Sequence, residues 1–398
     1  MDRSKWEYKK LGEVCAPKSD ILRANKLFGN DDIIDYVDIS SIDNTTHCIT
    51  QPTSYVFKEA PSRAQQKVEQ GDILYSLVRP NLKNVAVVTS QDTEKYVASS
   101  GFCVLRGKEI ETRYLYHMVL GNTFTNYILG LVSGANYPAV REDDVKGFTF
   151  RCPPITDQQR IVAELDCLNE MIAVKQEQLK EFDKLAQSIF YDMFGDPVLN
   201  EKRWEIRPLG ELISIMGGFA FKSSSYVDIG IRLVQIANVW EDNIKWDEIT
   251  HVPKEDVNKR PDYLLKPGDI VMALTRPIIK SLGSVKIARI RNCDIPCALN
   301  QRVCKFAFSN SLLSPHWFYH FARTDYFKDM INSFSSKGMQ PNVSTKEIES
   351  ILTPYIPLSL QQQFADKISA IEAQKELVKQ SIAETQALLD YTMDKYFG

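Results

Sequence analysis

The sequence predicts an α+β protein with two similar mixed α/β domains and two long antiparallel coiled-coil helices, related by a pseudo-two-fold internal repeat. Three observations predict this class. Sequence landmarks recur after about 200 residues, each copy ends in an apolar heptad series, and short strand-like runs with Gly-Asp turns fill the remainder. The expected parts are a first domain over 1–152, a central helix over 153–198, a second domain over 199–356 and a C-terminal helix over 357–398.

The repeat is defined by landmarks that keep their order and nearly keep their spacing. Chance similarity would not preserve the order of four landmarks, so the chain is interpreted as a tandem duplication. The paired landmarks are Lys5-Trp6-Glu7 with Arg203-Trp204-Glu205, Gly71-Asp72-Ile73 with Gly268-Asp269-Ile270, Gln158-Gln159 with Gln361-Gln362, and Phe194-Gly195 with Phe397-Gly398.

Both helix segments carry apolar residues at alternating steps of four and three, which is the seam of a coiled coil. Both open with a capping box, Thr156-x-x-Gln159 and Ser359-x-x-Gln362. Each helix is expected to span about 38 residues, or roughly 55 Å. An antiparallel pair is favoured because each copy then meets its twin about a two-fold axis. The seam positions are Leu165, Leu168, Ile172, Leu179, Phe182, Ile189, Ile368, Ile371, Val378, Ile382 and Leu389.

In the two globular blocks, short apolar runs predict strands, and each block has one late amphipathic helix. The helices are expected over Arg113–Leu129 and Pro315–Asn332. The strands are expected over Ile33–Ile39, Ile73–Val78, Val85–Thr89 and Val97–Leu105, and over Leu233–Val239, Ile270–Thr275, Val285–Ile290 and Arg302–Phe308.

Motifs for chemistry are missing from the sequence. It contains no G-x-x-x-x-G-K-[ST] phosphate loop, no G-x-G-x-x-G, no H-E-x-x-H and no G-x-S-x-G. Cys293, Cys297 and Cys304 lack zinc-site spacing, and His316 with His320 is better explained by packing. We therefore expect a binding protein without catalytic or metal-ligating residues. With no long apolar run and no signal-like start, we expect a cytoplasmic chain with free thiols and no membrane contact.

The net charge of −3 conceals a basic second domain. Residues 276–305 include seven basic residues and one acidic residue, which would attract phosphates, although a solvated basic face explains them equally well. Loops at equivalent positions in the two copies follow buried strands, where binding residues concentrate. The candidate DNA-binding residues in these loops are Arg79, Asn81, Lys83, Asn84, Asn136, Tyr137, Arg276, Lys280, Ser281, Lys337, Gln340 and Asn342.

Two variable domains, each followed by a long helix that opens with Pro-x-x-x-Gln-Gln, resemble the specificity subunit of type I restriction–modification systems. Leu209-Gly210-Glu211, the two Gly-Asp-Ile motifs and Phe194-Gly195-Asp196-Pro197 carry the resemblance along the whole chain. One departure is Gln363, which replaces the basic Arg160 of the first copy.

The resemblance implies two target-recognition domains, each reading one half of a bipartite, asymmetric site in double-stranded DNA, with the helices setting the spacer. It also implies two adenine-N6 methyltransferase subunits that bring S-adenosylmethionine, and restriction subunits that bring ATP and Mg²⁺ for translocation. This chain would hold no cofactor itself.

Two alternatives remain at this stage. The coiled coil would equally suit a duplicated protein adaptor that does not bind DNA, whereas the basic segment and the matched loops favour DNA. A detached recognition half of a single-chain restriction–methylation enzyme would differ only in the number of its partners.

Overall fold

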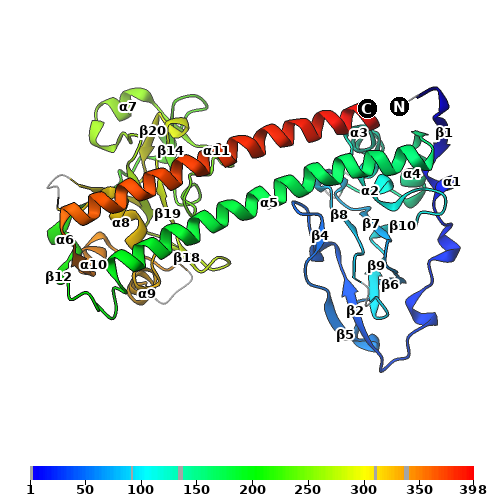
Figure 1. The fold of residues 1–398 in the computed structure, drawn as a ribbon, viewed down its shortest axis with the longest axis horizontal. Coiled ribbons are helices and arrows are strands. Elements are labelled where there is room, and N and C mark those ends of the chain that lie inside the picture. The colour runs from blue at the N-terminus through cyan, green and yellow to red at the C-terminus, as the bar shows by residue number, and fades with distance from the viewer. Residues whose placement is uncertain (1–2, 91–92, 133–137, 309–311, 336–339) are drawn as a thin grey trace. The chain divides into compact units, whose positions relative to one another are not determined.

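The structure, a computed structural model, describes residues 3–90, 93–132, 138–308, 312–335 and 340–398. Contacts divide the chain into two units (Figure 1). The first unit contains Met1–Gln176 and Lys379–Gly398, and the second contains Glu177–Val378. Each unit therefore holds one globular domain with about half of each long helix, so the contacts do not separate the helices from the domains as the sequence segments did. The predicted α+β class is confirmed.

The first domain combines small sheets with four helices. One sheet has the order β10-β7-β8 and another the order β5-β2-β9-β6, in which β2 and β9 are parallel. The strands are β1 (Glu7–Lys10), β2 (Ile33–Val37), β3 (Ile42–Asp43), β4 (Cys48–Ile49), β5 (Thr53–Val56), β6 (Ala64–Lys67), β7 (Ile73–Ser76), β8 (Val85–Val87), β9 (Tyr96–Ser99), β10 (Phe102–Leu105) and β11 (Thr149–Cys152). The helices are α1 (Leu11–Val14), α2 (Thr112–Leu120), α3 (Asn122–Leu131) and α4 (Glu142–Lys146).

The second domain repeats this plan. Its sheets have the orders β13-β21-β16-β19 and β15-β14-β20, and β14 is again parallel to β20. The strands are β12 (Glu205–Pro208), β13 (Ser214–Gly217), β14 (Ile231–Val234), β15 (His251–Val252), β16 (Ile270–Ala273), β17 (Ile278–Ile279), β18 (Ser284–Val285), β19 (Ile287–Arg289), β20 (Cys297–Leu299), β21 (Val303–Ala307) and β22 (Leu352–Tyr355). The helices are α6 (Leu209–Leu212), α7 (Lys254–Asn258), α8 (Pro315–Phe321), α9 (Asp325–Phe334) and α10 (Thr345–Glu349).

The Gly-Asp motif is the turn that leads into the central strand of each domain. Gly71 and Gly268 have φ values of 90° and 89°, which a residue with a side chain rarely adopts. The following carboxylates accept the backbone N–H three residues upstream, from Glu69 to Asp72 at 2.8 Å and from Lys266 to Asp269 at 2.9 Å. The motif therefore shapes the fold in both copies.

Several predicted elements are broken in two. The expected helix over Arg113–Leu129 is divided at Gly121 into α2 and α3. The expected helix over Pro315–Asn332 is interrupted before Thr324, whose side chain caps α9 by accepting the N–H of Phe327. The predicted strand Val97–Leu105 is β9 and β10 with a turn between them, and Val285–Ile290 is β18 and β19. Buried residues resume directly after each break, as at Phe102 and Phe124, so the apolar pattern did not mark the breaks.

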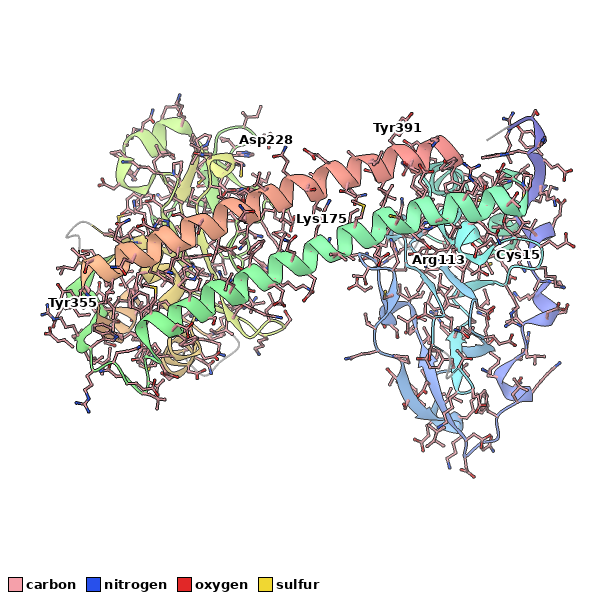
Figure 2. All side chains as sticks on the ribbon, viewed as in Figure 1. Cys15, Arg113, Lys175, Asp228, Tyr355 and Tyr391 are labelled. Atoms are coloured by element: carbon pink, nitrogen blue, oxygen red, sulfur yellow. The ribbon has the colours of Figure 1, made fainter. Side chains whose placement is uncertain are left out.

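The long helices α5 (Ile155–Phe194) and α11 (Leu358–Phe397) have 40 residues each. In the first unit, Tyr396 donates to Glu164 at 2.6 Å and Lys175, labelled in Figure 2, donates to Thr385 at 2.9 Å. In the second unit, Lys375 donates to Asp183 at 2.7 Å, and the rings of Phe194 and Phe364 lie 5.2 Å apart. Numbers rise along α5 as they fall along α11, so the helices pack antiparallel within each unit.

Along these helices, the eleven predicted seam residues are all buried or half-buried. The buried ones are Leu165, Leu168, Ile172, Ile368, Ile371 and Leu389, and the half-buried ones are Leu179, Phe182, Ile189, Val378 and Ile382. The polar interruptions Lys175, Lys375 and Thr385 are hydrogen-bonded between the helices. Phe190 and Phe194, which the prediction omitted, are also buried.

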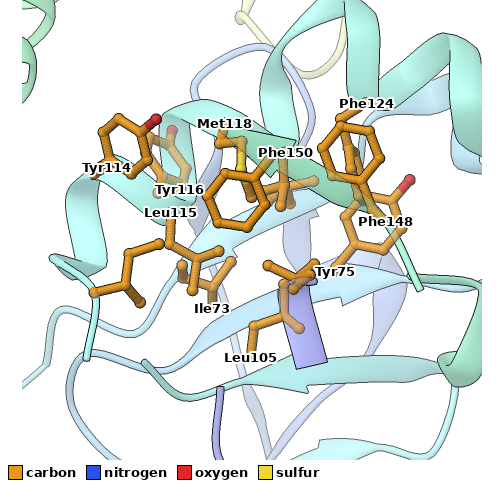
Figure 3. Packing of buried hydrophobic residues seen from close by; sticks show 14 of the residues in the cluster. Ile73, Tyr75, Leu105, Tyr114, Leu115, Tyr116, Met118, Phe124, Phe148 and Phe150 are labelled. Atoms are coloured by element: carbon orange, nitrogen blue, oxygen red, sulfur yellow. The ribbon is translucent and has the colours of Figure 1, made fainter. Parts of the chain in front are cut away.

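Each domain core continues into the helices of its own unit. In the first, Phe124 packs edge-on against Tyr75 and Phe148, as Figure 3 shows, and the same cluster includes Leu165 and Tyr396. In the second, Trp317 lies between Phe321 and the rings of α5. Each domain is therefore fixed rigidly on its own helix segments.

Candidate nucleic-acid interface

The loop after the central strand has the same unusual backbone in both domains. Arg79 and Arg276 each have a φ of 48°, in the left-handed region, and each precedes a proline. Such a conformation costs on the order of 1–3 kcal/mol and concentrates at functional sites. Both arginines are exposed at their surface positions. The duplication has therefore kept a strained, exposed arginine at one place in each domain.

A second loop holds each arginine in place. The backbone N–H of Arg79 donates to the carbonyl of Pro138 at 2.8 Å, and that of Arg276 donates to Pro341 at 2.7 Å. The early and late loops that the sequence matched only by position thus meet in space in both copies. Of the late-loop candidates, Asn136, Tyr137 and Lys337 lie outside the described residues.

The remaining candidates of the first domain divide by role. Asn81 is exposed, whereas Lys83 is half-buried and donates to the carbonyl of Leu120 at the end of α2, at 3.1 Å. Asn84 is half-buried, and its carbonyl accepts the N–H of Ser76 at 3.0 Å. Lys83 and Asn84 therefore hold the loop, while Asn81 is available at the surface.

In the second domain, the loop after Arg276 is longer and forms the hairpin β17–β18. Lys280 and Ser281 are exposed in its turn beside Leu282, which is 53% exposed. Gln340 and Asn342 are exposed in the late loop. The Asn342 amide accepts from Thr275 at 2.5 Å and donates to the Gln340 carbonyl at 3.0 Å, which fixes the loop against β16.

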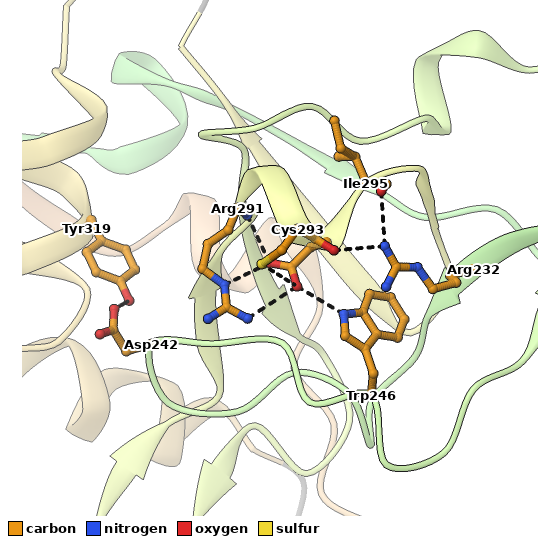
Figure 4. Close-up of polar contacts among 8 residues, drawn as sticks. Arg232, Asp242, Trp246, Arg291, Cys293, Ile295 and Tyr319 are labelled. Atoms are coloured by element: carbon orange, nitrogen blue, oxygen red, sulfur yellow. Dashed lines mark hydrogen bonds and ion pairs between the residues drawn. The ribbon is translucent and has the colours of Figure 1, made fainter. Parts of the chain in front are cut away.

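The basic segment 276–305 separates into paired and unpaired cations. Arg289 bonds Glu372 at 2.8 Å, Arg291 bonds Asp294 at 3.0 Å and Lys305 lies 3.7 Å from Asp269. Asp294 accepts from Arg291 Nε and from Trp246 Nε1, each at 3.0 Å, and Figure 4 shows these two donor side chains with their bonds as dashed lines. Within the described chain, no ion pair is found for the other four, which are Arg276, Lys280, Lys286 and Arg302. Fewer cations than the sequence suggested are therefore available for phosphate.

Sequence reasoning missed Trp240 and Lys245. The Lys245 ammonium lies 4.0 Å from the centre of the Trp240 ring and that of Lys286 lies 5.9 Å from it. Burial, together with the charge of Arg276, lowers the pKa of Lys286. Asn238 pins this loop by donating to the carbonyls of Lys245 and Glu248, each at 2.9 Å. The interleaving of Trp240, Lys245 and Trp246 was the available signal.

The Gln-Gln motif is structural. Gln158 accepts the N–H of Glu111 and donates to Pro153, both at 2.8 Å. Gln361 accepts the N–H of Ser314 at 2.6 Å and donates to Ile356 at 2.7 Å. Each buried amide thus joins the start of a long helix to the helix that opens the late part of its domain.

Charged contacts also fix each domain to its helices. Arg113 donates to both oxygens of Asp166, at 3.1 and 2.7 Å, and His117 Nε2 lies 2.6 Å from the same carboxylate. Burial would raise the pKa of Asp166, but hydrogen bonds from His117 and Arg113 outweigh it and lower the pKa to about 2.

The second domain uses a different set of contacts. Asp242 accepts from Tyr319 at 2.5 Å and lies 3.7 Å from Lys375, which also bonds Asp183. His320, 203 residues after His117, faces the Phe364 ring instead of a carboxylate. Burial lowers the pKa of His320 to about 3, so it is neutral at pH 7.

The described residues contain no group of three His, Cys, Asp or Glu side chains placed to hold a metal ion. Burial raises the pKa of the Cys297 and Cys304 thiols to about 12, while Cys293 is exposed. In the described part of the chain, no helix has the length and apolar character needed to cross a bilayer.

Comparisons with known proteins agree with this geometry. A family described as "Type I restriction modification DNA specificity domain" matches residues 3–182 and 201–387. The chain is 25% identical to the type I restriction enzyme MjaVIII specificity subunit of Methanocaldococcus jannaschii, over 67% of this chain and 65% of that protein. It is 33% identical to the EcoAI specificity subunit of Escherichia coli, over 42% of this chain and 28% of that protein. The matches thus span less than two thirds of these two relatives.

Solved structures give similar folds. A chain from work on "complex assembly and conformational transition of the type I R-M system" aligns with a TM-score of 0.60 at 25% identity, covering 99% of this chain and 97% of that one. The type I restriction-modification S subunit of M. genitalium aligns with a TM-score of 0.50 at 15% identity, covering 99% of this chain and 96% of that one, which shows the fold alone.

Proposed function

Because this chain belongs to the type I restriction–modification DNA specificity family, we propose that it is the DNA-specificity subunit of a type I restriction–modification complex. Each domain contacts one half of a bipartite, asymmetric site in double-stranded DNA. The helices dock two adenine-N6 methyltransferase subunits, and restriction subunits join them. The complex works in the cytoplasm.

The observation that carries the proposal is the strained arginine of each domain, clamped by a second loop. Guanidinium groups contact phosphates and pair with guanine edges in the major groove. A left-handed backbone fixed by Pro138 or Pro341 presents such a group at a set place beside the end of a buried strand. The arrangement recurs in both domains, which fits two half-sites better than it fits an adaptor that binds only proteins.

This chain supplies recognition and positioning, and the reactions belong to its partners. Methyl transfer would use S-adenosylmethionine bound to the methyltransferase subunits, and translocation would use ATP and Mg²⁺ bound to the restriction subunits. Exposed cations and amides of this chain would hold the duplex while the partner takes the target adenine out of the stack.

The test is retention of duplex DNA by the chain co-purified with its methyltransferase subunits, measured across salt concentrations. We expect affinity to fall steeply as salt rises. Arg276→Ala and Lys280→Ala should each weaken binding, by about 1–3 kcal/mol if the side chain contacts a base edge. The exposed Lys95, on the first domain, gives a matched control in Lys95→Ala. A complex that assembles but does not retain DNA at any salt would support the adaptor instead.

A further inference from the structure

The first domain has three adjoining surface hollows, and Arg23 lines all three. Together they are called the furrow. Their volumes are 640, 350 and 260 Å³. The largest is lined by Lys18, Ser19, Ile21, Arg23, Gln65, Gln66, Leu77, Ser100, Phe102, Arg141 and Glu142. None of these residues was a candidate on sequence grounds, because they come from separate stretches of the chain.

The furrow is positively charged. Its cations are Lys18, Arg23, Lys26 and Arg141. Among the described residues that line the three hollows, Glu142 alone carries a carboxylate. Lys146 bonds that carboxylate at 2.8 Å and Lys18 bonds its other oxygen. With Glu142 neutralised in this way, the charges of Arg23 and Arg141 are left without a partner in the described chain.

The walls of the furrow are held rigidly. Arg23 forms an isolated bridge with Gln66, and the carbonyl of Leu22 accepts the N–H of Lys67 at 2.9 Å. Arg141 caps α4, and its N–H donates to Asp144 at 2.7 Å. Residues placed on fixed backbone bind a rigid ligand without a large ordering cost.

The furrow also leads to the clamped arginine. Leu77, in its wall, accepts the N–H of Val140 at 2.9 Å, and two residues later Arg79 bonds Pro138. Residues 77–79 thus pair with residues 138–140, and Arg79 and Arg141 lie at the ends of these two paired segments. A ligand in the furrow would therefore extend toward the loop that holds Arg79.

The polar groups that line the furrow indicate whether it suits base edges or phosphates of a nucleic acid. The Gln66 amide already donates to the carbonyls of Ser99 at 2.8 Å and Phe102 at 2.9 Å, and the Gln65 amide donates to Ser62 at 2.8 Å. The two glutamine amides of the largest hollow are thus bonded to backbone carbonyls, whereas the guanidinium groups of Arg23 and Arg141 have no ion-pair partner in the described chain. This combination suits phosphate, which needs charge without a base-specific pattern.

We propose that the furrow binds the sugar–phosphate backbone of the duplex beside the half-site read by the first domain. This inference rests on the proposed function. At the position of Arg141 the second domain has Ser344, which caps the equivalent helix with the same bond from its N–H to the carboxylate three residues on. Lys222 stands where the first domain has Arg23. The charge of Arg141 is therefore specific to the first domain.

The test is Arg23→Glu with Arg141→Glu in the full chain co-purified with its methyltransferase subunits, measured on mixed-sequence duplex DNA. Both side chains are exposed, so folding should be unaffected. We expect at least about a tenfold loss of affinity. The slope of log Kd against log salt should be shallower by about 0.9 for each phosphate that the variant no longer neutralises. Lys95→Glu, which makes the same charge change as one of the two substitutions but elsewhere on this domain, should leave both values unchanged.

The methylated sequence in cells should remain the same, because phosphate contacts carry no sequence information. If the double variant binds DNA as tightly as the wild-type complex does, the furrow does not bind the DNA backbone, and the proposed function stands. A changed methylation sequence would also overturn it, by showing that the furrow reads bases. Failure of the wild-type complex to bind any duplex would instead remove the proposed function.

Discussion

The two domains share a backbone plan but differ in the side chains that attach them to the helices. In the first domain, the Asp166 carboxylate on α5 bonds both Arg113 and His117 of α2. In the second, Asp183 and Asp242 share Lys375, and His320 faces an aromatic ring. Duplication has kept the glycine turns, the buried glutamines and the strained arginines. The charged contacts to the helices differ between the copies, so each domain is attached to the helices by its own set of side chains.

Replacing the buried glutamine at the start of either long helix should cause the largest loss of stability, because each joins its helix to its domain. Gln361→Leu leaves the Ser314 N–H and two carbonyls without partners, so we expect about 4 kcal/mol of destabilisation, at 1–3 kcal/mol per stranded group. Gln158→Leu strands fewer groups and should cost about 3 kcal/mol. Urea denaturation measures both values.

The neighbouring glutamines provide the control for this comparison. Gln159 and Gln362 are exposed, so their leucine variants should change stability by less than about 0.5 kcal/mol. Equal costs for buried and exposed positions would show that the motif does not hold the helices to the domains.

The second-largest expected effect is a loss of stability in acid that arises in the second unit, at His320. Its folded pKa of about 3 lies below the unfolded value, so the unfolded chain binds the proton preferentially once pH falls below about 6.5. Stability should then decrease by about 3 kcal/mol between pH 6.5 and pH 4. The charged groups around this ring are Arg323, Arg289, Asp242 and Lys375.

His320→Leu should flatten that pH dependence. Denaturation midpoints at pH 7 and pH 4 measure the difference. An identical acid response in the wild type and in His320→Leu would contradict the neutral, buried state assigned to this histidine.

The smallest expected effect belongs to Asp166. Its pKa is depressed to about 2, so its contribution is full above pH 4 and is lost as pH falls from about 4 to 2. Because the carboxylate is partly exposed, we expect Asp166→Asn to cost only about 1 kcal/mol at pH 7. The difference from wild type should shrink toward pH 2, and a constant difference at both pH values would exclude the ion pair as its source.

The repeat, the long helices and the strand-end loops could be predicted from the sequence, because each leaves a signal in the order or spacing of nearby residues. It could not sort the cations of segment 276–305, since Glu372, the partner of Arg289, lies far along the chain. Nor could it find the furrow, whose walls come from Lys18, Gln65 and Arg141. Position along the chain located Arg79 and Arg276, but their left-handed backbone depends on loops that meet only after folding.

The central claim is that each domain reads its own half of the DNA site. The most direct measurement is the methylated sequence in cells that carry either Arg79→Ala with Asn81→Ala or Arg276→Ala with Lys280→Ala. We predict that the first pair relaxes specificity in one half of the bipartite sequence and the second pair relaxes it in the other half. Relaxation of both halves by one pair, or of the same half by both pairs, would contradict this division.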